Sequence, residues 1–381
     1  MNSRLILPPG HRIGYIEGLA LLTVYMMGKV FTSCPSQMIY LESTSGWITT
    51  ALAAIPAGLG MAANYYFVSR FHGLEYQRCL ELTIGRVAGK AVGALLVAFT
   101  IGLNAIPLRE VSGGLKTAIL QETPLGVIAF VAMLVSAWSA ALGPEPVGRF
   151  AALTIFPMSI LLLFALFGSL REEFCLAELF PLWGTGIGKT IAGAIPCSSI
   201  YSEGFAIGVL MPHIREAAPR QGLRLALTSL LLAALALSLT IMITTAIFTA
   251  PVGAQTLYPA LQIARLIVFS IFIERMEALF VFAGIILTAI KFAVGLLVGS
   301  FLLAGVLGVR RWDIIVWPLA ALTYFACFRP ETLIDVFYLQ ITLFRSCGWI
   351  IAFVLPSVLL FIAHVRKVPG DRSEAYRRDD S

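Results

Sequence analysis

Long apolar runs, separated by short polar segments, make up most of the chain. A helix needs about 20 apolar residues to cross a hydrocarbon core of roughly 30 Å. A β-barrel would instead show short, weakly alternating segments. The pattern therefore predicts an all-α membrane protein with ten transmembrane helices, near residues 13–41, 46–68, 86–108, 124–142, 146–169, 188–212, 221–249, 276–308, 312–328 and 341–365.

A further apolar stretch, residues 255–273, is interrupted by Pro259 and Arg265. Proline removes a helical hydrogen bond, and a charged side chain is costly in lipid. We therefore interpret this stretch as a short surface or re-entrant helix, and the sequence leaves both possibilities open.

The composition agrees with a membrane protein. Hydrophobic residues make up 59% of the chain and charged residues 13%, whereas soluble domains carry about a quarter charged residues. The six cysteines form no CxxC pair, which argues against a disulfide framework or a metal site. Because HExxH, GxSxG and Walker A motifs are also missing from the sequence, we expect neither an enzyme nor a bound cofactor.

The distribution of basic residues predicts an orientation. Lys and Arg are concentrated in the segments that share a side with the N-terminus, and such segments are usually cytoplasmic. We therefore expect a cytoplasmic N-terminal segment 1–12, one transmembrane domain 13–365 and a disordered cytoplasmic tail 366–381. The net charge of +6 is explained by this bias without a nucleic-acid partner.

Ten helices divide into two sets of five, which predicts an inverted repeat with halves 13–169 and 188–365. The first helix of each half carries helix-breaking residues: Gly28 and Pro35 in one, Pro196 and Gly204 in the other. Transporters built from inverted repeats bind their ligands at such interrupted helices.

A break exposes N–H groups, which favour a carboxylate, and carbonyls, which suit an ammonium group. Together they indicate a zwitterion such as an amino acid. The alternative is a Pro-kinked structural helix whose serine hydroxyls bond back to the preceding turn.

Polar residues near the two breaks are the candidate site. The predicted ligand-binding residues are Tyr25, Gly28, Thr32, Asn104, Ser198, Ser199, Tyr201, Glu203 and Gly204. Charges inside or beside the spans supply candidates for ion or proton coupling: Glu203, Lys291, Glu274 and Glu277. Interhelical ion pairs are the alternative role for these charges, and Glu17 and Lys29 are interpreted as structural.

Two segments carry a resemblance to a known family. They are ELFPLWGTGIGKTIAGAIPCSSIYSEGFAIGVLMPHI and LYPALQIARLIVFSIFIERMEALFVFAGIILTAIKF, which contain the Glu203 break, the acidic cluster at Glu274 and Glu277, and Lys291. The interruption at Gly28, Trp47 at the start of the second span and Arg109-Glu110 at the end of the third also fit. The chain resembles the spore germination permease family (GerAB, the B subunits of nutrient-germinant receptors), within the amino-acid/polycation/organocation transporter superfamily.

The resemblance implies a LeuT-like 5+5 fold in the inner membrane of an endospore. It also implies an A-type membrane subunit and a C-type lipoprotein as partners, and a nutrient such as L-alanine as ligand. A proton-coupled amino-acid transporter on the same fold is the main alternative, and a ligand-opened channel is a third possibility.

Overall fold

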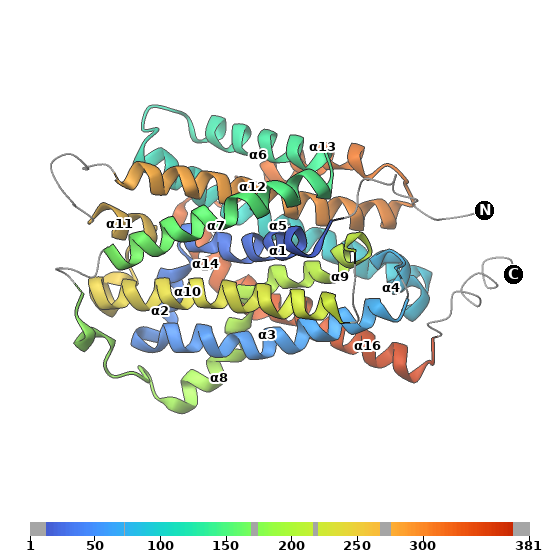
Figure 1. Cartoon of the computed structure of the whole chain (residues 1–381), viewed down its shortest axis with the longest axis horizontal. Helices are drawn as coiled ribbons and strands as arrows, with labels where there is room; N and C mark the ends of the chain where they lie inside the picture. Colours follow the sequence, from blue (N-terminus) through green and yellow to red (C-terminus); the bar gives the residue numbers. More distant parts are fainter. Residues whose placement is uncertain (1–12, 72, 169–173, 216–219, 267–275, 369–381) are drawn as a thin grey trace, which may run out of the picture.

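The computed structural model describes residues 13–71, 73–168, 174–215, 220–266 and 276–368. Figure 1 shows a bundle of helices that run approximately along one axis; the first described helix, Tyr15–Met27, begins and the last, Leu355–Val365, ends at the same end of the bundle. Within the described ranges, the β-type pairing recorded is one bridge between Ile13 and Ile214. The bridge joins the start of the first helix to the segment after the second interruption.

The described residues of the first half of the chain form seven α-helices. They are α1 (Tyr15–Met27), α2 (Cys34–Glu42), α3 (Gly46–Ser69), α4 (Tyr76–Ile84), α5 (Arg86–Ala118), α6 (Leu125–Ala141) and α7 (Pro144–Gly168).

The second half contains α8 (Ile187–Cys197), α9 (Ala206–Leu210), α10 (Gln221–Gly253), α11 (Pro259–Arg265), α12 (Met276–Leu307), α13 (Trp312–Ala326), α14 (Leu333–Leu339), α15 (Arg345–Trp349) and α16 (Leu355–Val365). Two π-helical turns, η6 (Gln340–Phe344) and η7 (Ile350–Val354), join the last three. We call residues 333–365 the last helical stretch.

Among the residues that the structure describes, seven helical stretches are long and apolar enough to cross a membrane, and α6 and α13 are shorter apolar helices. Large apolar side chains cover the outside of the bundle, for example Phe130 on α6 and Leu153 and Phe156 on α7. An apolar exterior of this extent is expected where the surface faces lipid. The chain is an all-helical, multi-pass membrane protein.

Most predicted span boundaries lie within a few residues of the observed helix ends. Three differences stand out. Helix α5 continues to Ala118 rather than ending near residue 108, the last helical stretch begins at Leu333 rather than residue 341, and the amphipathic helix α4 was not predicted. The stretch 255–273 contains α11, and its part beyond residue 266 lies outside the described residues.

Helix α1 lies at the centre of the bundle, where it packs against α10, α7 and α12. Helix α3 packs on the other side of α10, and α12 also packs against α5 and α6. Almost every residue of α1 from Gly18 to Met27 is buried, so its interruption at residue 28 lies inside the protein and not in lipid.

Both predicted interruptions are present. After α1 the chain forms the 3₁₀ turn η1 (Gly28–Phe31), Thr32 is extended, and α2 begins with Pro35 in its first turn, where proline is tolerated. After α8 the chain forms η4 (Ser198–Phe205), a 3₁₀ segment of 8 residues. Runs longer than 3–4 residues are uncommon and often mark functional hinges.

Candidate functional site

Three charged side chains meet between the two interruptions. Glu203 in η4 lies 2.6 Å from the Lys29 Nζ atom and 2.8 Å from the Lys291 Nζ atom. Glu203 and Lys291 are fully buried, and Lys29 is 6% exposed. Two lysines and one glutamate form a cluster with one excess positive charge if all three are ionised. We call them the lysine–glutamate cluster.

The backbone around the lysine–glutamate cluster accepts hydrogen bonds from both lysines and leaves space for the Lys291 side chain. Lys29 Nζ also donates to the Ile200 carbonyl at 2.7 Å, and Lys291 Nζ donates to the Tyr25 carbonyl at 3.3 Å. A Cβ atom at Gly28 would lie 2.7 Å from Cδ of Lys291, so a glycine is needed where Lys291 passes the break. The cluster thus connects η1, η4 and α12.

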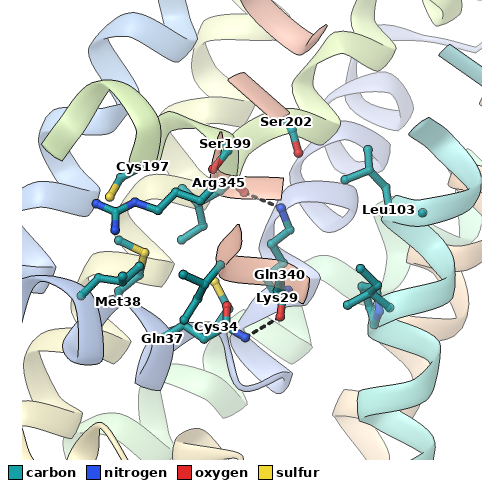
Figure 2. Close-up of a pocket in the computed structure, with 16 residues that line it drawn as sticks. Lys29, Cys34, Gln37, Met38, Leu103, Cys197, Ser199, Ser202, Gln340 and Arg345 are labelled. Atoms are coloured by element: carbon teal, nitrogen blue, oxygen red, sulfur yellow. Dashed lines mark hydrogen bonds between the residues drawn. The ribbon is translucent and has the colours of Figure 1, made fainter. Parts of the chain in front are cut away.

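A cavity of about 60 Å³ lies beside the cluster, between the two interruptions, α5 and the last helical stretch. One ordered water needs roughly 10–15 Å³ by this measure, so the space fits a few non-hydrogen atoms. Its polar lining comprises Lys29, Gln37, Ser199, Ser202, Gln340 and Arg345. Figure 2 shows the Arg345 guanidinium near Cys197 and Met38, with Lys29 at the other side of the cavity. We call this space the polar cavity.

Arg345 forms an ion pair with an acidic residue that does not line the cavity. Its Nη2 atom donates to Glu42 Oε1 at 2.7 Å, and the two side chains are 23% and 6% exposed. The Cys197 thiol also contacts Glu42 Oε1, at 3.7 Å. Arg345 lines the cavity and Glu42 does not, so the cavity is faced by a guanidinium with spare donors.

Hydrogen bonds join three elements along one wall of the polar cavity. The Ser33 hydroxyl donates to Glu110 on α5, and the Gln37 amide donates to Ser33 at 2.9 Å and to Gln340. The prediction that Arg109-Glu110 ends the third span is wrong. Because α5 is longer than expected, Glu110 is buried within it.

The predicted ligand-binding residues fall into two groups. Ser199 lines the polar cavity; Glu203 and Tyr25 belong to the lysine–glutamate cluster or contact it. The hydroxyls of Ser198 and Ser199 donate to the carbonyls of Ile195 and Pro196, the back-bonding that the structural alternative predicts.

The remaining predicted residues are buried elsewhere. The Thr32 hydroxyl donates to the Lys29 carbonyl within the turn, and Tyr201 donates to the Thr50 carbonyl of α3. Gly204 packs against Met61, and Asn104 against Gly295. These residues position the break rather than line the cavity. Of the coupling candidates, Glu274 lies outside the described residues and Glu277 lies in the first turn of α12.

Sequence reasoning missed most of the cavity's polar lining. Ser202 has a buried hydroxyl with no hydrogen-bond partner among the described residues. Lys29 was interpreted as structural, and Arg345, near the start of the predicted span 341–365, was not named as a site residue. A signal for Arg345 existed, because Gln340 and Arg345 are polar side chains at the start of an apolar run. The residues that the structure describes contain no group of three or more His, Cys, Asp or Glu that would hold a metal ion.

Comparisons with known proteins agree with this architecture. A solved manganese transporter from Eremococcus coleocola, in complex with an aromatic bis-isothiourea compound, superposes with a TM-score of 0.56. The match covers 92% of this chain and 85% of the transporter at 13% sequence identity. At that identity the likeness shows a shared fold.

Sequence comparison identifies the family. Spore germination protein B2 of Bacillus subtilis (strain 168) is 21% identical over 94% of this chain and 97% of that protein. Spore germination protein A2 of the same organism is 23% identical over 72% of this chain and 75% of that protein. The family model described as spore germination protein matches residues 12–335. The chain therefore belongs to the spore germination protein family, whose members are not enzymes.

Proposed function

We propose that this protein is the B-type subunit of a nutrient-germinant receptor and that it binds a small amino acid in the polar cavity. The observation that carries the proposal is a polar cavity at two helix interruptions, faced by Lys29 and Arg345. Ligand binding at such breaks biases the conformation of the surrounding helices, because a ligand shifts an equilibrium when it binds one state better. Partner subunits would sense that bias.

The charges around the cavity favour a carboxylate. Arg345 and Lys29 face the space, whereas Glu42 and Glu203 lie behind them as their partners. A guanidinium binds a carboxylate with two parallel hydrogen bonds. Cys34 and Gln37 bring the first turn of α2 to the same cavity, and a helix N-terminus adds favourable dipoles.

Neutral oxygen atoms in the cavity lining would accept hydrogen bonds from the ammonium group of the ligand. The Ser202 hydroxyl is unpartnered among the described residues, and the side-chain oxygens of Gln37 and Gln340 lie in the same lining. Glu203 is already paired with two lysines. In this proposal the cluster stabilises the break, and the ligand's ammonium group binds hydroxyl and amide oxygens.

The proposal includes the wider architecture. The ten spans would form the LeuT-like inverted repeat, with halves 13–169 and 188–365, in the inner spore membrane with both termini cytoplasmic. The partners would be an A-type membrane subunit and a C-type lipoprotein. Support comes from the family membership and from the shared fold with a transporter.

The test uses the purified full-length protein in nanodiscs and a panel of radiolabelled amino acids, with L-alanine first. We expect saturable binding that is displaced by the unlabelled amino acid and not by the amine that lacks its carboxylate. The amine competing as well as the amino acid would contradict the carboxylate assignment. No binding by any member of the panel would contradict the amino-acid proposal.

The second candidate is a proton-coupled amino-acid transporter. It is favoured by the fold shared with a solved transporter and by titratable groups buried at the break. Counterflow in liposomes separates the two candidates. Uptake that follows a proton gradient would support the transporter, whereas binding without flux would support the receptor.

A further inference from the structure

A second cavity, of about 280 Å³, lies between α5, the end of α13 and the last helical stretch. Its lining is apolar apart from Arg329 and the thiols of Cys327 and Cys347. An engineered apolar cavity of about 150 Å³ stays dry and binds benzene or xenon. A cavity of this size and polarity is therefore a poor site for water and a good one for a hydrocarbon group. We call it the apolar cavity.

The apolar cavity is elongated along α5. Its lining on that helix runs from Leu95 to Ile106, which is roughly 16 Å at 1.5 Å per residue. Leu95 lies on the exposed outer surface, being 48% exposed, so the cavity opens on the lipid-facing side. Arg329 is exposed at the far end, where Arg109 of α5 donates to the Glu331 carbonyl at 2.8 Å.

A cation at one end of an elongated apolar cavity matches an anionic amphiphile. We propose that this cavity binds one acyl chain of an anionic phospholipid, with the lipid phosphate against Arg329. The bilayer supplies the chain from the side, and the guanidinium binds phosphate oxygens. A phospholipid whose headgroup carries no net charge loses most of the attraction to the guanidinium.

The site shares a wall with the polar cavity, since Gly102 and Ile106 line both. Phe99 lines the apolar cavity and its ring lies 5.9 Å from the ring of Phe205 in η4. Gly348 lines it too, and a Cβ atom there would lie 3.2 Å from the Cβ atom of Ser199. A bound acyl chain thus contacts the residues that support η4, and its occupancy changes ligand affinity in the polar cavity. This second step rests on the proposed function, whereas the lipid site does not.

Native mass spectrometry of the purified full-length protein tests the site with dioleoyl phosphatidylglycerol and dioleoyl phosphatidylcholine as probes. We expect one phosphatidylglycerol to be retained about fivefold more strongly than phosphatidylcholine, the scale of one basic residue at a charged membrane surface. Arg329→Gln should remove this preference, and Arg265→Gln, at another exposed arginine, should retain it. Equal retention of the two lipids by the unmodified protein would overturn the proposal.

A second pair of variants tests the cavity itself. Ala98 lines the cavity and is exposed on α5, and Ala91 is exposed on the same helix but does not line it. Ala98→Trp should fill the cavity and abolish lipid retention, whereas Ala91→Trp should leave lipid retention unchanged. Equal lipid retention by both variants would overturn the proposal.

A measurement without substitutions covers the case in which Ala98→Trp does not fold. Cys347 lines the cavity and is exposed, and Cys175 is exposed elsewhere. Phosphatidylglycerol in nanodiscs should slow maleimide labelling of Cys347 and leave Cys175 unchanged, compared with phosphatidylcholine. Unchanged labelling of Cys347 would overturn the site. Amino-acid affinity measured in the two lipids then tests the coupling, and equal affinities would overturn that step alone.

Discussion

Two groups of charges flank the polar cavity, and they differ in burial and in charge balance. The lysine–glutamate cluster combines Lys29, Glu203 and Lys291, and its acid is fully buried. The second group is the Glu42–Arg345 pair, whose arginine is 23% exposed and faces the cavity. The first joins η1, η4 and α12. The second joins α2 to α15.

The difference separates structural support from recognition. A buried charge that loses its partner is strongly destabilising, so the cluster fixes the two interruptions relative to α12. The Glu42–Arg345 pair is simpler and more accessible, and its guanidinium has donors left for a ligand. We therefore expect substitutions at Glu203 and Lys291, which do not line the cavity, to act mainly on stability, and substitutions at Arg345 to act mainly on binding.

The largest effect is expected for Glu203→Gln. The substitution leaves two buried ammonium groups without a carboxylate, which costs about 3–5 kcal/mol. The measurement is denaturant unfolding of the purified protein in detergent micelles. A loss below about 1 kcal/mol would show that the cluster does not stabilise the break.

Lys291→Met is expected to cost less, about 2 kcal/mol. The substitution removes one charge-assisted hydrogen bond but leaves a balanced Lys29–Glu203 pair. The double variant Glu203→Gln/Lys291→Met should be more stable than Glu203→Gln alone, because it has one unpaired ammonium group and not two. Strictly additive losses would contradict the charge-balance account.

Arg345→Gln should separate binding from stability. We expect at least about a tenfold loss of amino-acid affinity, since a bidentate carboxylate contact disappears. The stability loss should be about 1–2 kcal/mol, because Glu42 is left unpaired. Adding Glu42→Gln should restore stability and leave binding lost, and Arg345→Lys should bind with intermediate affinity. Unchanged affinity in Arg345→Gln would remove this residue from the site.

The breaks were predictable because their causes are local. Gly28 with Pro35, and Pro196 within a serine-rich run, interrupt apolar helices in the sequence itself. Most span boundaries follow from the same apolar pattern. The pairing of Lys29 with Glu203 was not predictable, because it depends on how η1 packs against η4.

Arg345 lies near a helix boundary that the apolar pattern did not predict correctly, the start of the last helical stretch. The pattern placed this residue at the start of the predicted span 341–365 and left Gln340 outside it, because these polar side chains interrupt the apolar run. In the structure those side chains point from the last helical stretch into the polar cavity. Polar residues within a membrane-spanning helix therefore marked the site. Their partners were not predictable from the pattern, because Glu42, which pairs with Arg345, and Gln37, which donates to Gln340, both lie on α2.

The smallest effect is expected for Glu145→Gln, which calibrates the others. Glu145 and Arg149 form an i,i+4 ion pair at the start of α7, with side chains 24% and 70% exposed. Water screens such a pair, so its loss should cost no more than about 0.5 kcal/mol. The same unfolding measurement applies. If Glu145→Gln were as harmful as Glu203→Gln, burial would not explain the difference between the charge groups, and the distinction between support and recognition would fail.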